Sequence, residues 1–172
     1  MQARLLDKSQ PLAKRMRVVC SLRAVPGQGT VEALASCLDD ESALLRHEIA
    51  YALGQKEDLE AMPLLIQTLR ADKDPMVRHE AAEALGAIGA PEAISILKEY
   101  EHCDVEEVAH TCQLALDRIR WNAAKNQDAN AADSGCPAPT SLTWIVSYCH
   151  ELQTDAVDWM LTETQKAPSL CP

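Results

Sequence analysis

The sequence predicts an all-α protein, an α-solenoid of repeated helical hairpins. One leucine recurs at Leu22, Leu53, Leu85 and Leu116, at steps of 31, 32 and 31 residues. A period in the thirties, with two apolar segments in each unit, is typical of stacked helix pairs that bury their faces against their neighbours. Aromatic residues make up only 3% of the chain, and no run alternates polar and apolar residues as a strand would. We therefore expect four helical units and no sheet.

Two of these units can be delimited by their apolar segments and polar breaks. The segments are 30–38 and 43–53 around the break 39–42, and then 59–70 and 76–88 around the break 71–75. Ser42 is a candidate N-cap, and the Asp-Pro pair at 74–75 puts proline at or just before a first helical turn, where its missing N–H costs nothing. Gly54, Gly86 and Gly89 are predicted to reverse the chain after each second helix.

The repeats occupy the first part of the chain. We expect a repeat domain over residues 1–121, a flexible linker over 122–139, which is polar and rich in small residues, and an irregular tail over 140–172. The tail holds one more His-Glu pair, at 150–151. We interpret that pair as a coincidence because the Arg before it and the Ala-Leu-Gly after it are missing.

Charge and cysteine content limit the function classes. A net charge of −10 argues against nucleic-acid binding, which needs a basic surface, and suits a basic partner, although acidity can equally serve solubility. We expect no membrane span and no secretion signal, and hence a cytoplasmic protein. The seven cysteines are odd in number and form no Cys-x-x-Cys motif. Buried, reduced thiols are predicted rather than a zinc or disulfide framework.

Two repeats carry a His-Glu pair at the same position: His47 with Glu48, and His79 with Glu80, 32 residues later. His79 is two residues from Val77 in the apolar stripe, about 200° around the helix, so it is predicted to face away from the core. Second helices of stacked repeats line one surface roughly 10 Å apart, so the imidazoles should point the same way. Such nitrogen and oxygen ligands suit a redox metal such as iron.

A structural interpretation of these pairs stays open. Each Glu could instead pair with Arg46 or Arg78, and repeat duplication would copy such a pair just as faithfully. His110 occupies the same repeat position, but Thr111 replaces the Glu, so we expect it to be structural. The zinc-protease pattern His-Glu-x-x-His is not completed in either repeat, and no glycine-rich phosphate loop is present.

The motifs LRHEIAYALGQ at 45–55 and DPMVRHEAAEALGAIG at 74–89 resemble the deoxyhypusine hydroxylase family, over about residues 12–121. The resemblance implies a HEAT-like (PBS-lyase-type) solenoid that uses O₂ and a di-iron centre. Its substrate is the deoxyhypusine side chain, a modified lysine of a translation factor, which becomes hypusine. Family members carry four His-Glu motifs, two in each half. By that match His47, Glu48, His79 and Glu80 are the metal ligands of the N-terminal half.

The chain departs from the family pattern because no second set of repeats follows residue 121. With two matching motifs instead of four, we expect a truncated chain that needs a second half, or another copy of itself, to complete a di-iron site. The alternative is a non-catalytic HEAT-like scaffold that binds a protein or peptide and has lost its metal.

Overall fold

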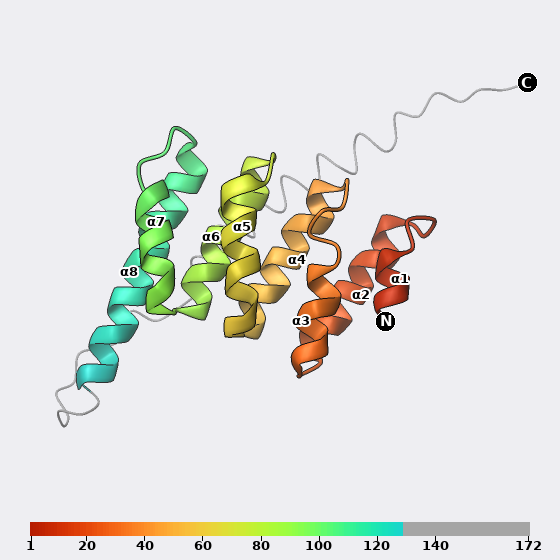
Figure 1. Cartoon of the computed structure of the whole chain (residues 1–172), viewed down its shortest axis with the longest axis horizontal. Coiled ribbons are helices and arrows are strands. Elements are labelled where there is room, and N and C mark those ends of the chain that lie inside the picture. Colours follow the sequence, from red (N-terminus) through yellow and green to blue (C-terminus); the bar gives the residue numbers. More distant parts are fainter. Residues whose placement is uncertain (129–172) are drawn as a thin grey trace, which may run out of the picture. The chain divides into compact units, whose positions relative to one another are not determined.

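The computed structural model describes residues 1–128, which form a row of stacked helices (Figure 1). The helices are α1 (Gln2–Leu6), α2 (Leu12–Ala24), α3 (Gln28–Ala35), α4 (Ala43–Lys56), α5 (Met62–Ala71), α6 (Pro75–Ile88), α7 (Ile94–Tyr100) and α8 (Glu106–Asp128). Short 3₁₀ turns, Leu59–Ala61 and Pro91–Ala93, precede α5 and α7. Within residues 1–128 no strand is present, so the all-α prediction is confirmed.

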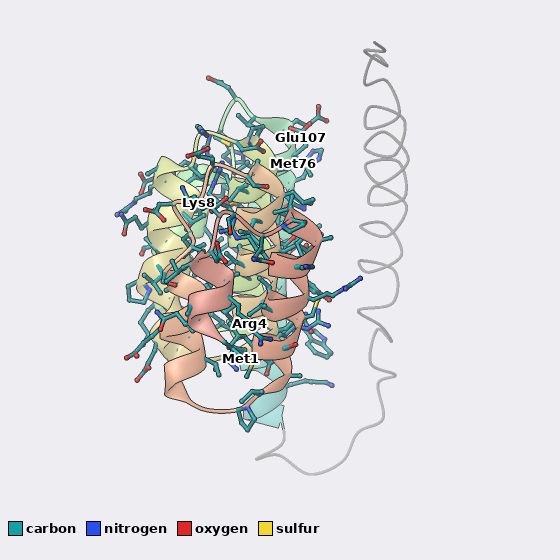
Figure 2. All side chains as sticks on the ribbon, turned by 90° about the vertical axis from the view of Figure 1, so that its right-hand side faces the viewer. Met1, Arg4, Lys8, Met76 and Glu107 are labelled. Atoms are coloured by element: carbon teal, nitrogen blue, oxygen red, sulfur yellow. The ribbon has the colours of Figure 1, made fainter. Side chains whose placement is uncertain are left out.

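The second helix of each hairpin packs against the second helices of its neighbours. In this layer α4 lies between α2 and α6, and α6 lies between α4 and α8, while α3, α5 and α7 cover the other side (Figure 1). Figure 2 looks along the row from the α1 end, and Met76 and Glu107 mark the ends at which α6 and α8 begin. Two layers of helices enclosing one apolar core are the expected architecture of a solenoid.

The recurring leucine is the centre of each repeat core. Leu53, Leu85 and Leu116 are fully buried and Leu22 is nearly so, which confirms the period derived from the sequence. Burying a leucine side chain contributes about 1.5–3 kcal/mol, so these four positions hold the hairpins together.

Helices α4 and α6 both begin with a side-chain cap, of which the one at Ser42 was predicted. Ser42 Oγ accepts a hydrogen bond from the Leu45 amide at 3.3 Å, and Asp74 Oδ1 accepts one from the Met76 amide at 2.9 Å. Each cap satisfies an amide that the first helical turn leaves without a partner. Both second helices therefore begin at the same point of their repeats.

The turn role predicted for three glycines is right for Gly89 only. Gly89 ends α6 in the left-handed conformation, with φ 73°, but Gly54 and Gly86 lie inside α4 and α6 and are buried. A Cβ on Gly54 would stand 2.7 Å from Ala84 Cβ, and one on Gly86 would stand 2.7 Å from Ala115 Cβ. These two glycines are required because the neighbouring second helix approaches too closely for a side chain.

Buried ion pairs link α2 and α4 each to the loop that precedes the next second helix. Arg15 binds Asp40 at 2.6 Å, and Arg46 binds Asp72 through two nitrogens at 2.7 and 2.8 Å. Burial by itself raises the pKa of Asp72, but the hydrogen-bonded Arg46 guanidinium outweighs it and lowers that pKa below its ordinary value. These pairs fix the loops from which the second helices start.

The prediction of buried cysteines is met at two of the four described positions. Cys37 and Cys112 are buried and Cys103 is half-buried, whereas Cys20 is exposed; all four are free thiols. Burial raises the pKa of the Cys112 thiol to about 12, so it stays protonated at neutral pH. Cysteines 136, 149 and 171 lie outside the described residues.

Helix α8 continues to Asp128, so residues 122–128, assigned above to a linker, are helical. Ala123, Ala124 and Lys125 favour a helix, and the Lys125 ammonium lies 4.1 Å from the centre of the Trp121 ring one turn earlier. The remaining linker and tail predictions, for residues 129–172, lie outside the described residues. Between residues 1 and 128 no helix is both long and apolar enough to span a bilayer.

Candidate metal centre

The two His-Glu pairs occupy the same register of neighbouring helices. His47 is the fifth residue of α4 and His79 the fifth of α6. Because both helices start from matching caps and α4 approaches α6 closely at Gly54, the side chain of His47 reaches across the narrow space to α6.

The His47 ring points toward α6. Its Nε2 lies 3.2 Å from Glu80 Oε2. Its Nδ1 lies 3.8 Å from Glu48 Oε1, beyond hydrogen-bond distance, and is buried with no hydrogen-bond partner. A buried ring nitrogen without a partner is uncommon in native proteins and marks a place where a ligand fits.

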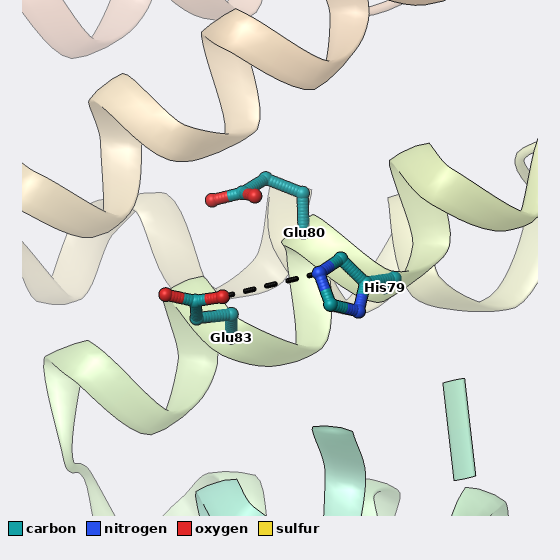
Figure 3. Close-up of side chains that lie close together, drawn as sticks. All are labelled: His79, Glu80 and Glu83. Atoms are coloured by element: carbon teal, nitrogen blue, oxygen red, sulfur yellow. Dashed lines mark ion pairs between the residues drawn. The ribbon is translucent and has the colours of Figure 1, made fainter. Parts of the chain in front are cut away.

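The His79 ring points toward α8. Its Nδ1 lies 2.6 Å from Thr111 Oγ1, and its Nε2 lies 3.9 Å from Glu83 Oε2 on the next turn of α6. His79, Glu80 and Glu83 each offer one possible ligand atom, and these three atoms lie within 4.8 Å of one another. Figure 3 shows the three side chains. A nitrogen and two carboxylates at this separation can bind one cation.

Glu80 connects the two rings. Its carboxylate is only 7% exposed, pairs with His47 across the helices, and belongs to the cluster with His79 and Glu83. A buried carboxylate is costly unless a positive charge compensates it, and here the His47 imidazole, whose pKa is raised to about 10, supplies one. Glu80 is therefore the residue through which the α4 and α6 motifs act as one site.

The imidazoles do not project from an open surface as the sequence suggested. The side chains of His47 and His79 are 17% and 14% exposed, because each is covered by the following second helix. The histidines lie opposite the repeat core, as predicted. That side of α4 and α6 was expected to be open, but it faces a neighbouring helix.

The alternative in which each Glu pairs with an arginine is wrong. Arg46 is taken up by Asp72, and Arg78 donates to the Leu69 carbonyl at 3.0 Å and lies over the Tyr100 ring. With the arginines engaged elsewhere, neither Glu48 nor Glu80 is neutralised by one. Both glutamates instead lie within ion-pair distance of His47.

Two residues of the site were not predicted from the sequence. Glu83 follows His79 by four residues and so shares its helix face, a spacing that could have singled it out. Thr111 occupies the repeat position of Glu80, 31 residues later, and was interpreted only as a lost glutamate. His110 beside it lies on the exposed face of α8, with 64% of its side chain accessible.

The pKa values of the two imidazole rings are shifted in opposite directions. Burial lowers the pKa of His47, but the carboxylates of Glu48 and Glu80 outweigh burial and raise it to about 10. Burial dominates at His79 and lowers its pKa below 6.5. At neutral pH His79 therefore offers a free nitrogen, whereas His47 must lose a proton before it binds a metal.

Comparison with known protein families and structures identifies relatives. A model described as HEAT repeats matches residues 5–117. The chain is 46% identical over 138 residues to the deoxyhypusine hydroxylase of Drosophila melanogaster, which covers 78% of this chain and 46% of the fly protein. It is 51% identical over 118 residues to the Homo sapiens protein of that name, covering 68% of this chain and 39% of the human one.

A solved structure agrees with the sequence relatives. The structure of human deoxyhypusine hydroxylase in complex with glycerol aligns with a TM-score of 0.71 at 44% sequence identity, over 81% of this chain and 46% of that one. The chain thus spans about half the length of the curated relatives it matches.

Proposed function

Because this chain belongs to the HEAT-repeat family and is a homologue of deoxyhypusine hydroxylase that spans about half of such a protein, we propose that it forms part of an iron-dependent deoxyhypusine monooxygenase. The proposed reaction is the O₂-dependent hydroxylation of the deoxyhypusine side chain of a translation factor, which gives hypusine. It takes place in the cytoplasm, where that factor works.

One observation carries the proposal: the buried carboxylate of Glu80 lies between the imidazoles of two repeats, and a nitrogen of one of them is buried without a partner. The donor set of imidazole nitrogens and carboxylate oxygens fits a non-haem iron site. In the proposal His47, Glu48, His79 and Glu80 hold iron, with Glu83 beside them. Bound iron supplies activation of O₂ for attack on a C–H bond.

The residues of this chain have three tasks in the proposed reaction. His79 Nε2 and the Glu80 carboxylate hold the cation, and the covering helices keep bulk water away from it. Glu83, together with the net charge of −10, attracts a side chain that carries the positive charges of a polyamine. A dinuclear centre needs more ligands than these, so we propose that a second half or another copy of the chain supplies the rest.

The first prediction concerns iron retention. Ferrous iron added anaerobically to the purified chain, alone and mixed with the other half of a complete relative, should remain bound after desalting. Once it is exposed to O₂, the iron-loaded mixture should hydroxylate a translation factor that carries deoxyhypusine, with the ferrous ions supplying the two electrons of one turnover. Iron content is measured by elemental analysis and the product by mass spectrometry. His79→Gln should lose the iron, whereas His110→Gln, an exposed histidine one repeat later, should keep it.

A metal-free chain whose thermal stability is unchanged by ferrous iron would contradict the proposal, because a ligand that binds only the folded state raises its stability. That result would favour the alternative, a HEAT-like scaffold for a protein or peptide.

A further inference from the structure

Thr111 stands where the repeat pattern calls for a third glutamate. It follows Glu80 by 31 residues, as Glu80 follows Glu48 by 32. It is buried, at 7% exposure, and its Oγ1 lies 2.6 Å from His79 Nδ1. Glu80 approaches His47 from the following helix in the corresponding way, at 3.2 Å. The position of Thr111 is thus the position from which each repeat contacts the histidine of the repeat before it.

The two contacts engage different nitrogens. Glu80 meets the Nε2 of its histidine, whereas Thr111 meets the Nδ1 of His79. Contact with Thr111 at Nδ1 leaves Nε2 of His79 on the side of Glu80 and Glu83, the two carboxylates of the cluster (Figure 3). Which nitrogen of a neutral imidazole carries the proton is set by the hydrogen bond that the other one makes.

The surroundings of Nδ1 favour a proton on it. Buried threonines in helices commonly donate their hydroxyl to the carbonyl four residues earlier, as Thr68 does to Leu64 at 2.9 Å in α5. A Thr111 hydroxyl that donates in this way offers its lone pairs to the ring.

From this geometry we propose that Thr111 is a positioning residue: it accepts the Nδ1–H of His79, fixes the ring and its tautomer, and so directs the Nε2 lone pair at a divalent cation shared with Glu80 and Glu83. The inference rests on the proposed function for the cation. The orientation of the ring and its tautomer can be tested without it.

The tautomer is measured on metal-free protein by long-range ¹H–¹⁵N NMR of the histidine rings, with the His79 signals identified from their loss in His79→Gln. Wild type should show the Nδ1–H form. Thr111→Val, which keeps the shape and removes the hydroxyl, should shift His79 toward Nε2–H. Thr111→Ser, which retains the hydroxyl, should restore the wild-type pattern.

Cation binding is measured separately, by titration with Co²⁺ followed through its visible absorption. Thr111→Val should weaken Co²⁺ binding by about 10- to 100-fold, the usual effect of removing a partner that orients a ligand. Thr68→Val is the matched control, since Thr68 is equally buried, at 8% exposure, and lies in α5 of the other layer. It should leave both the spectrum and the affinity unchanged.

The outcomes separate the inference from the proposed function. A Thr111→Val protein that keeps both the Nδ1–H form and the wild-type Co²⁺ affinity overturns the positioning role and leaves the metal site standing. A wild-type protein that binds neither Co²⁺ nor ferrous iron overturns the metal site, and the NMR comparison then still decides whether Thr111 fixes the tautomer.

Discussion

The α4–α6 and α6–α8 interfaces are formed by the same repeat, and each contains one histidine. The two histidines differ in the residue that faces the ring and in the direction in which their pKa is shifted. In the first, Glu80 faces His47, and the carboxylates raise the pKa of the ring to about 10. In the second, Thr111 faces His79, and burial lowers the pKa of the ring. The carboxylates of Glu48 and Glu80 thus outweigh burial at His47, whereas burial dominates at His79, where a hydroxyl stands at the repeat position of Glu80.

The difference explains why the two histidines should not contribute equally. His79 is ready to bind a cation, since its ring is neutral and held at Nδ1. His47 is held by a buried ion pair with Glu80 and would have to lose a proton before it could bind a metal. Glu80 belongs both to the ion pair with His47 and to the cluster with His79 and Glu83. A change at Glu80 should therefore affect both histidines.

The largest expected effect is that of Glu80→Gln, which keeps the shape and removes the charge between the rings. Metal affinity should fall by more than about 100-fold, because losing even an outer partner of a ligand costs 10- to 100-fold. The pKa of His47 should also fall, since one of its two carboxylates is gone. Co²⁺ titration and NMR measure the two effects, and Glu99→Gln, a change at an exposed carboxylate in α7, is the control. Retained affinity would show that Glu80 is not a ligand.

Substitutions at Gly54 and Gly86 should alter the α4–α6 and α6–α8 interfaces one at a time. Gly54→Ala should destabilise the fold by about 1–3 kcal/mol, the usual cost of overpacking, and separate α4 from α6 at the Ala84 contact. Gly86→Ala should do the same between α6 and α8 at Ala115, because each new Cβ would stand 2.7 Å from its neighbour. Gly54→Ala should perturb the His47 signals more, and Gly86→Ala those of His79.

Urea unfolding measures the stability of both variants. Gly29→Ala is their control, because a Cβ at Gly29 meets nothing within 4 Å; it should change stability little or raise it by up to about 1 kcal/mol. Equal stability of all three variants would contradict the close helix approach that we describe.

The smallest effects are pH profiles of the metal-free protein. His47 has a raised pKa, so its contribution to stability is complete below the unfolded value of 6.5 and is lost as the pH rises through about 10. His79 has a lowered pKa, so protonation of the unfolded chain destabilises the fold as the pH falls below 6.5. NMR titration should give two separate midpoints on either side of 6.5.

Exchanging the residue at position 111 sharpens the same comparison. Thr111→Glu places a carboxylate between α6 and α8, at the repeat position that Glu80 occupies between α4 and α6. The substitution should raise the pKa of His79 above its wild-type value. Circular dichroism checks that the variant is folded. An unchanged His79 midpoint in a folded variant would mean that the residue at this position does not set the difference between the two rings.

Much of this arrangement was predictable from the sequence. The leucine period indicated the number of hairpins. Ser42 and the Asp-Pro pair at 74–75 were recognised as starts of second helices, because caps and first-turn prolines act within a few residues. The His-Glu pairs were found because they recur at one repeat offset. Local signals and periodicity are sufficient for features that depend only on neighbouring residues.

The errors share one cause. Gly54 and Gly86 were predicted to lie in turns, and the histidines to face an open surface, because a single repeat does not show how closely the next one packs. The same limit applies to Arg46, whose partner Asp72 is 26 residues away, and to Thr111, which looked like a lost ligand until its contact with His79 was visible.

The sequence by itself determined that this protein is a stack of helical hairpins with His-Glu pairs in register, since helix period, capping and repeat spacing are properties of the chain. Only the tertiary structure decided what each histidine meets. That depends on how closely α4, α6 and α8 approach one another, and the approach is set by contacts about thirty residues apart, such as Gly54 with Ala84, which packing brings together in space.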